Sequence, residues 1–328
     1  MQIPYSLQGA LEARLAESPP TPVAQAAKRL TDRYQSRHAT SAVGALTPEE
    51  ALAYAAVRMP ATFGALSAAL EAVAQQQPDL APQSLLDIGA GPGTAIWAAR
   101  QVFPSVTRAT ALEREPAMRS LAQRLLNHAQ HPLSGRIDWV AEDMTTAPLT
   151  AHDLITASYV FGELTPAHRE AISRRLWAHA RQVLLIVEPG TPDGFARIRE
   201  IRDLLIDQGA RIIAPCPHEG HCPMAEGDWC HFATRIARSK RHRQLKGGDA
   251  PYEDEKYAYI AVTGQAVGVR PSRILRHPEI HPGRIRIELC TPDGLSSMTV
   301  TKQWRDAFRA ARKARWGDAW PADLPLRP

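Results

Sequence analysis

A glycine-rich segment, LLDIGAGPGTAIWAA at residues 85–99, constrains the fold of this 328-residue chain more than any other feature. The apolar run that ends at Ile88 predicts a strand, and the run after Gly93 predicts a helix, so the glycines lie at a strand-to-helix turn. Gly89 and Gly91 permit a tight turn and a close approach of the backbone to a ligand, and Gly93 lets the helix pack near the strand. We therefore expect a doubly wound α/β sheet with a ligand at this turn.

From residue 84 onward, short apolar segments alternate with amphipathic ones, which is typical of a parallel sheet covered by helices on both faces. The predicted strands are 84–88, 108–113, 137–141, 153–158 and 183–188, and the predicted helices are 94–102, 116–128, 166–180 and 194–208. Strand-like segments follow at 257–263, 284–290 and 298–302, before a last helix at 302–316. We expect three sections: a helical section at 1–80, an α/β core at 81–210 and a strand-rich extension at 211–328.

The acids around the glycine loop indicate which ligand it binds. Asp87 precedes a G-x-G-x-G pattern, which differs from the G-x-G-x-x-G of a pyrophosphate site and favours a cationic ligand. Glu113 ends the next strand, where a carboxylate can accept both ribose hydroxyls, and Asp143 follows the third strand, where it can meet an adenine amino group. The alternatives are a structural turn in another doubly wound protein and, for Asp143, an ordinary acid at a helix start.

This arrangement resembles the class I S-adenosylmethionine-dependent methyltransferases over roughly residues 84–190. The resemblance implies a Rossmann-like doubly wound sheet and a site for S-adenosylmethionine formed by Asp87, Gly89, Ala90, Gly91, Gly93, Glu113 and Asp143. After the fourth strand the chain reads DLITASYVFGEL, which lacks the N/D-P-P-Y/F loop of many amino methyltransferases. Gly162 and Glu163 face the expected substrate side, but no catalytic residue is assigned and catalysis stays open.

All four cysteines, Cys216, Cys222, Cys230 and Cys290, lie in the last third of the chain. Their spacing does not match the paired knuckles of a zinc ribbon. Four thiolates are the complement that a 4Fe-4S cluster needs, and irregular loops can present them. Three histidines near them would favour zinc instead if they act as ligands: His218, His221 and His231. Four thiols without a metal are the third alternative.

The basic residues are also concentrated in this extension, because residues 235–316 hold 18 Lys and Arg against 8 Asp and Glu. Residues 235–248 contain six cations and no acid, so we expect this run to meet an outside anion or solvent. In the last helix, Trp304, Phe308 and Ala311 recur at helical spacing, with Arg305, Arg309 and Arg312 on an adjacent face. We hypothesise that a bound metal folds both segments onto one RNA-binding surface.

Several motifs together identify a family: LLDIGAGPGTAIWAA, IVEPGTPDGF, PCPHEGHCPM, DWCHF, YEDEKYAYI and LCTPDG. They resemble bacterial relatives of methyltransferase-like protein 17, a mitochondrial assembly factor of the small ribosomal subunit, over nearly the whole chain. The resemblance implies a 4Fe-4S cluster on Cys216, Cys222, Cys230 and Cys290 and a role on the small subunit and its RNA. An active rRNA methyltransferase with a structural cluster, or a small-molecule methyltransferase, are the alternatives.

The sequence also predicts where the protein resides. No run approaches the roughly 18 uninterrupted apolar residues that a membrane span needs, and the first residues, MQIPYSLQGALEARL, lack a secretory signal. We therefore expect a cytoplasmic monomer with no membrane partner.

Overall fold

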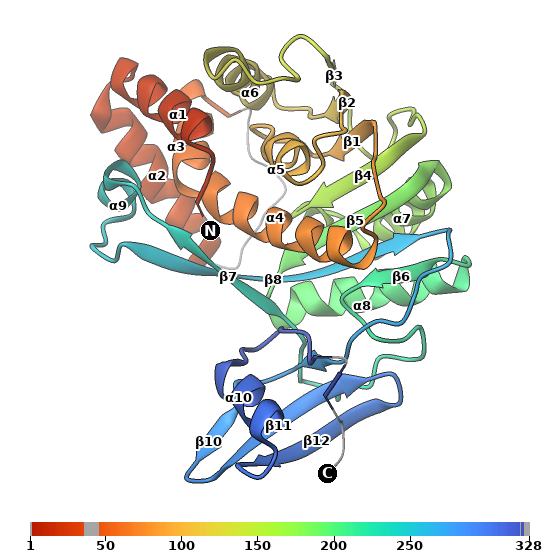
Figure 1. Ribbon diagram of the computed structural model, residues 1–328. Coiled ribbons are helices and arrows are strands. Elements are labelled where there is room, and N and C mark those ends of the chain that lie inside the picture. Colours follow the sequence, from red (N-terminus) through yellow and green to blue (C-terminus); the bar gives the residue numbers. More distant parts are fainter. Residues whose placement is uncertain (1, 36–45, 322, 325–328) are drawn as a thin grey trace.

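The computed structural model describes residues 2–35, 46–321 and 323–324, with residues 30–35 described by their backbone alone (Figure 1). Residues 36–45 of the predicted helical section therefore lie outside the described chain. No helix within the described residues is long and apolar enough to span a membrane.

The centre of the molecule is an eight-stranded sheet. Its strands are β1 (Ser84–Ile88), β2 (Arg108–Leu112), β3 (Ile137–Val140), β4 (His152–Ser158), β5 (Ala180–Pro189), β6 (Arg211–Ala214), β7 (Phe232–Ala237) and β8 (Tyr252–Thr263). The order is β3-β2-β1-β4-β5-β8-β6, and β7 pairs with β8. Strands β1 to β5 pair in parallel, whereas β8 runs antiparallel to β5, β6 and β7. The reversed strand β8, inserted between β5 and β6, gives a methyltransferase-like α/β fold, which confirms the α/β part of the predicted fold class.

Helices cover both faces of this sheet, as the alternation predicts. They are α5 (Thr94–Val102), α6 (Pro116–His128), α7 (Pro166–His179) and α8 (Pro192–Asp207), with a 3-10 turn, η1, at Phe161–Glu163. Strands β1 and β4 are buried almost throughout because they lie in the middle of the sheet with neighbours on both edges. The carboxyl ends of β1 to β4 therefore meet at one edge, directly after their buried segments.

The first section forms four helices: α1 (Tyr5–Glu17), α2 (Pro20–Gln35), α3 (Pro48–Val57) and α4 (Met59–Gln76). Helix α3 begins at a capping box, in which the Thr47 hydroxyl accepts from Glu50 N and the Glu50 carboxylate accepts from Thr47 N. Helix α4 packs on α5, β7 and β8. Its Gly64 allows this contact, because a Cβ there would lie 2.0 Å from Ile236 Cδ1.

The predicted boundary at residue 210 falls inside the core sheet, because β6, β7 and β8 all follow it. The basic run after the cysteine loop forms β7 and a short helix, α9 (Lys240–Lys246), which packs on α2 and α3. Alternating burial along β7 explains why the start of the basic run forms a strand: Phe232, Thr234 and Ile236 face the core, and Arg235 faces outward.

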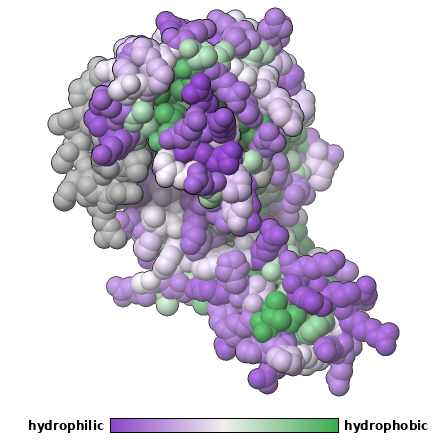
Figure 2. Space-filling model, turned by 90° about the vertical axis from the view of Figure 1, so that its left-hand side faces the viewer, coloured by the Kyte–Doolittle hydropathy of each residue, from purple (hydrophilic) through white to green (hydrophobic). Residues whose placement is uncertain are grey.

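The last section is a separate antiparallel sheet below the core (Figure 1). It contains β9 (Arg273–Ile274), β10 (Glu279–His281), β11 (Arg284–Thr291) and β12 (Gly294–Thr301), and helix α10 (Arg305–Lys313) packs on β11 and β12. Ile285, Ile287, Leu289, Met298 and Val300 form its buried face with Ala307 and Ala311 of α10. The view in Figure 2 shows a small hydrophobic patch on this section, within a mostly hydrophilic surface. Within the last sheet, Ile280 and Leu295 are the most exposed large apolar side chains.

Candidate functional site

The glycine loop joins β1 to α5 and has three left-handed residues in five positions. Gly89, Gly91 and Gly93 have φ values of +65°, +53° and +81°. A Cβ on Gly89 would lie 2.3 Å from Val160 Cγ1, whereas a Cβ on Gly91 would have no atom within 4 Å. At Gly93, which we expected to let the helix pack near the strand, a Cβ would make only ordinary contacts, the nearest with Ala122 Cβ at 3.5 Å. The backbone at Gly91 is thus the part of the loop that faces open space.

Glu113, directly after β2, braces this loop. Its Oε2 accepts from Gly91 N at 2.7 Å and its Oε1 accepts from Glu115 N at 2.8 Å. Burial raises the pKa of the Glu113 carboxyl, and these two backbone donors oppose that shift. Because each carboxylate oxygen has two lone pairs, the group retains acceptor capacity for ribose hydroxyls while it holds the loop.

Asp87 lies differently from the expected ligand-facing acid. It is only 1% exposed, and its Oδ1 accepts from the Thr156 hydroxyl on β4 at 2.8 Å. Burial raises its pKa to about 7, and the nearby Glu113 carboxylate contributes to the rise. Asp87 therefore joins two central strands beneath the loop.

Asp143 lies at the same edge but is half exposed. Its Oδ1 accepts from Thr145 N and from the Thr145 hydroxyl, at 2.8 and 2.6 Å, and these bonds lower its pKa. Arg114 Nη1 lies 3.3 Å from Asp143 Oδ2, and Arg114 Nη2 lies 4.0 Å from Glu163 Oε2. Arg114 Nε also lies 3.9 Å from Glu115 Oε1, so Glu115, Asp143 and Glu163 gather around one arginine, which the sequence did not single out.

The expected substrate side contains a buried ion pair that sequence reasoning also missed. Glu188, at the end of β5, is fully buried, and its Oε2 accepts from Arg197 Nε at 2.7 Å. Its Oε1 accepts from Phe161 N at 3.1 Å and so fixes the turn after β4. A Cβ on Gly162 would contact the Arg197 guanidinium at 3.4 Å. No pattern in the sequence pairs a strand acid with an arginine nine residues later on a helix.

The four cysteines lie around a second site. Cys216 and Cys222 belong to the loop after β6, Cys230 precedes β7, and Cys290 lies on β11. All four line one cavity, together with Phe195, Ile198 and Arg202 of α8 and Tyr259 of β8. Within the described residues, no three His, Cys, Asp or Glu side chains are grouped tightly enough to hold one metal ion. The thiols therefore lie along the walls of a shared cavity, which is lined by residues of both the core sheet and the last sheet.

Arginines surround the loop that carries Cys216 and Cys222. Arg202, which is 3% exposed, interacts with the Cys216 sulfur and donates to the carbonyl oxygens of His218 and Gly220 at 3.0 and 2.6 Å. Arg270 pairs with Glu219 at 2.7 Å, and Arg273 Nε donates to Pro215 O at 3.0 Å. Burial raises the pKa of the Cys216, Cys230 and Cys290 thiols, that of Cys290 to about 12.

The three histidines that we considered as alternative metal ligands lie in different surroundings. His218 Nε2 lies 3.7 Å from Cys290 Sγ. His231 stacks between Trp229 and Trp316, with ring centroids 5.7 and 4.0 Å away. His221 is exposed and does not line the cavity. Only His218 therefore lines the cavity with the thiols.

One expectation about the basic segments is wrong, because two acids of β8 pair with three of the six cations at 235–248. Arg235 pairs with Asp254, while Arg238 and Lys246 both pair with Glu253. The helices of the two segments lie apart, although Arg315, just after α10, interacts with Asp254. Helix α9 packs on α2 and α3, whereas α10 packs on the last sheet at the other end of the molecule (Figure 1).

A family model described as mitochondrial small ribosomal subunit Rsm22 matches residues 48–321. This chain belongs to the Rsm22 family. The match includes the core sheet, the cysteine loop and the last sheet, so the family relation extends across both candidate sites. It confirms the resemblance that the sequence motifs indicate.

Curated relatives of this Rsm22 family member have related names. The human mitochondrial ribosome assembly protein METTL17 is 27% identical over 296 residues, which cover 84% of this chain and 63% of that protein. Rsm22-cox11 tandem protein 2 of Schizosaccharomyces pombe is 24% identical, with coverages of 85% and 44%. The ribosome assembly protein RSM22 of Saccharomyces cerevisiae is 23% identical, with coverages of 44% and 36%. The chain thus spans less than two thirds of the length of each.

Solved structures share the fold only loosely. Magnesium protoporphyrin IX methyltransferase from Synechocystis superposes with a TM-score of 0.42 and 12% identity, over 72% of this chain and 91% of that one. Such a likeness adds nothing to the strand order, from which the fold is assigned.

Proposed function

We propose that this chain binds the small ribosomal subunit and assists its maturation. The observation that carries the proposal is the family match over residues 48–321, supported by relatives that are named as ribosome assembly proteins. A protein that binds rRNA can contact its phosphates through exposed arginines, which are suited to that role.

Helix α10 supplies the RNA-contacting face in this proposal. Ala307 and Ala311 pack on the last sheet, which leaves Arg305, Arg309 and Arg312 exposed. Among the described side chains, only Arg309 of these three has an ion-pair partner, the exposed Asp306 one turn earlier. The face therefore presents a net positive charge on a rigid helix, in keeping with phosphate contact.

The test measures binding of small-subunit rRNA at several salt concentrations. Replacing Arg305, Arg309 and Arg312 by alanine should flatten the slope of log affinity against log salt by roughly 2 to 3, since each lost phosphate contact removes about 0.9. The matched control replaces three exposed arginines of the core, Arg108, Arg124 and Arg136, which changes the charge equally. If both triple variants lower affinity alike, α10 is not the contact; if wild type does not co-sediment with small subunits, the function is wrong.

The glycine loop and the acids beside it are proposed to bind S-adenosylmethionine. The supporting observations are the open backbone at Gly91, the remaining acceptor capacity of Glu113 and the negative charge of the surrounding acids, which suits a sulfonium cation. Gly89, Ala90 and Gly93 shape the loop, while Asp87 and Asp143 complete the acidic edge. The bound cofactor would supply an activated methyl group, and no residue of this chain is assigned as a catalytic base.

The cysteine cavity is proposed to hold a 4Fe-4S cluster on Cys216, Cys222, Cys230 and Cys290. A single zinc ion needs all four sulfurs about 2.3 Å from one point, whereas thiols spread along the walls of one cavity suit the larger cluster. Arg202 and Arg270 offset the negative charge that four thiolates bring. Anaerobically purified protein should contain about four irons and four labile sulfides per chain; stoichiometric zinc without sulfide would reverse the assignment.

Methylation of rRNA is the second candidate function, and the braced glycine loop beside the η1 turn favours it. The two functions differ in one observable. If cells that lack the protein lose a methyl group from small-subunit rRNA, and the purified protein restores it, the chain is an enzyme. If maturation is impaired while the methylation pattern is unchanged, it acts as an assembly factor alone.

A further inference from the structure

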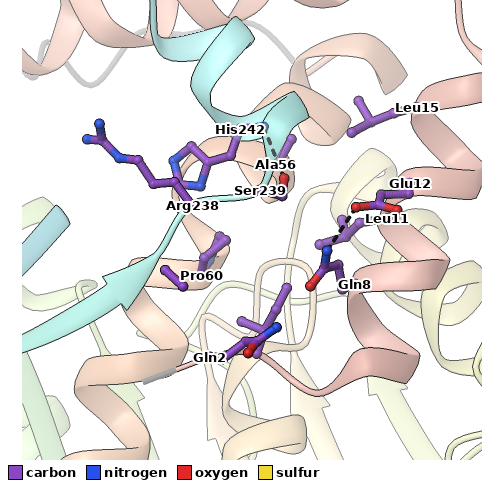
Figure 3. Close-up of a pocket in the computed structure, with 12 residues that line it drawn as sticks. Gln2, Gln8, Leu11, Glu12, Leu15, Ala56, Pro60, Arg238, Ser239 and His242 are labelled. Carbon is purple, nitrogen blue, oxygen red and sulfur yellow. Dashed lines mark hydrogen bonds between the residues drawn. The ribbon is translucent and has the colours of Figure 1, made fainter. Parts of the chain in front are cut away.

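A third cavity lies away from both sites, between the N-terminal helix α1, the junction of α3 and α4, and the β7–α9 connection (Figure 3). Its volume is about 220 Å³. Its lining includes Gln8, Leu11, Leu15, Pro60, Ser239 and His242. Nothing in the proposed functions above uses it.

The walls combine an apolar slot with a few fixed polar groups. Leu11, Leu15 and Pro60 supply apolar surface from two helices. On the α1 side, Gln8 Nε2 donates to Glu12 Oε1 at 2.9 Å, which orients the Gln8 amide (Figure 3). An oriented amide carries both a donor and an acceptor, so this wall can recognise a group with the complementary pair.

The α9 side carries a histidine with an unused ring nitrogen. His242 is 3% exposed, and its Nε2 has no hydrogen-bond partner among the described residues; the nearest carboxylate oxygen is Glu253 Oε1 at 3.6 Å. Burial lowers the pKa of His242 to about 4, so the neutral ring has one donor and one acceptor nitrogen. The Ser239 oxygen accepts from His242 N, which leaves the hydroxyl proton free to donate.

Positive charge surrounds the α9 end of the cavity. Arg238 and Lys246 are held by Glu253, and the Arg238 guanidinium turns away from α1 (Figure 3). Lys240 and Arg241 are exposed, and neither has an ion-pair partner among the described side chains. Lys240 follows Ser239 and Arg241 precedes His242, so both belong to the segment that forms this wall of the cavity.

We propose that this cavity receives one unpaired nucleotide of RNA, with its base in the slot and its phosphates on Lys240 and Arg241. A flat base fits apolar walls and meets Gln8, Ser239 and His242 with its hydrogen-bonding edge, as unpaired bases do in sequence-specific RNA recognition. A purely apolar ligand would leave the His242 nitrogen and the Ser239 hydroxyl without partners. The inference rests on the proposed contact with rRNA and names a second, separate contact point.

The test compares two RNA hairpins that differ by a single bulged nucleotide, together with free mononucleotides. Wild type should bind the bulged hairpin about tenfold more tightly than the paired one, as one base contact provides. Gln8→Trp fills the cavity from α1 and should abolish this preference. The matched control is Ser6→Trp, because Ser6 is exposed on the same helix and does not line the cavity. His242→Phe should reduce the preference without filling the slot.

The outcomes separate this inference from the proposed function. Equal binding of both hairpins by wild type, or a preference that survives in Gln8→Trp, would overturn the nucleotide site while leaving salt-dependent rRNA binding through α10 intact. Tight binding of a free mononucleotide with no preference between the hairpins would also overturn the RNA assignment. Thermal unfolding of each variant shows that it is folded before its binding is compared.

Discussion

Replacing Gly89 or Gly91 by alanine should separate folding from cofactor binding, although the two residues are neighbours in one loop. Both have a positive φ, so an alanine at either position costs about 1 to 2 kcal/mol of folding free energy. At Gly89 the new Cβ would also lie 2.3 Å from Val160 Cγ1, and such overpacking adds roughly 1 to 3 kcal/mol. At Gly91 the new Cβ meets nothing within 4 Å.

We therefore expect Gly89→Ala to lower the unfolding free energy by about 2 to 5 kcal/mol and Gly91→Ala by about 1 to 2 kcal/mol. Binding should follow the opposite order, because a methyl group on Gly91 projects into the space assigned to S-adenosylmethionine. Urea denaturation measures the first quantity, and calorimetric titration with the cofactor measures the second. If folded Gly91→Ala binds with wild-type affinity, or loses as much stability as Gly89→Ala, the assignment of the Gly91 backbone to the cofactor site is wrong.

Three further predictions concern charge and thiols. Because the pKa of Asp87 is raised to about 7, a bound cation should favour its ionised form, so affinity for S-adenosylmethionine should rise between pH 6 and 8, and calorimetry on Asp87→Asn should show no such rise. Cys290→Ser should lower both bound iron by analysis and the stability of the last sheet by hydrogen exchange. Burial lowers the pKa of His131 to about 4, so the unfolded chain alone gains a proton as pH falls from 6.5 to 4. His131 should then cost up to about 3 kcal/mol of stability across that window, and denaturation of His131→Asn should show a shallower loss.

The sequence was most informative where local patterns and the fold agree. The predicted helix at 94–102 and the predicted strand at 84–88 match α5 and β1, because the glycine loop fixes both boundaries chemically. The capping box at Thr47 likewise marks the start of α3, since its two hydrogen bonds are local. The predicted strand at 284–290 matches β11, whose apolar residues alternate, which is a local signal as well, whereas β12 begins four residues before the predicted 298.

Long-range contacts were not predictable in this way. The charges at 235–248 suggested an unneutralised surface, because their partners Glu253 and Asp254 lie on the next strand and become neighbours only through pairing of β7 with β8. The hydrogen bond that the Thr156 hydroxyl donates to Asp87 was unpredictable for the same reason, since the two residues are 69 positions apart in sequence. The position of Cys290 beside the cysteine loop depends on how the two sheets pack. The spacing of the cysteines in the sequence gives no information about that packing.

The position of β8 sets an order of events during synthesis. It pairs with β5 on one side and with β6 on the other, although the whole cysteine loop and α9 come between β6 and β8 in the chain. A growing chain that has reached β6 therefore leaves one edge of β5 unpaired until residue 263 has emerged, and by then Cys216, Cys222 and Cys230 have all been made. The core sheet can thus be completed before Cys290 on β11 has been made, so the thiol cavity closes at a later stage than the sheet. A chain interrupted before β8 would expose an open strand edge of β5, which can pair with other chains, together with three thiols.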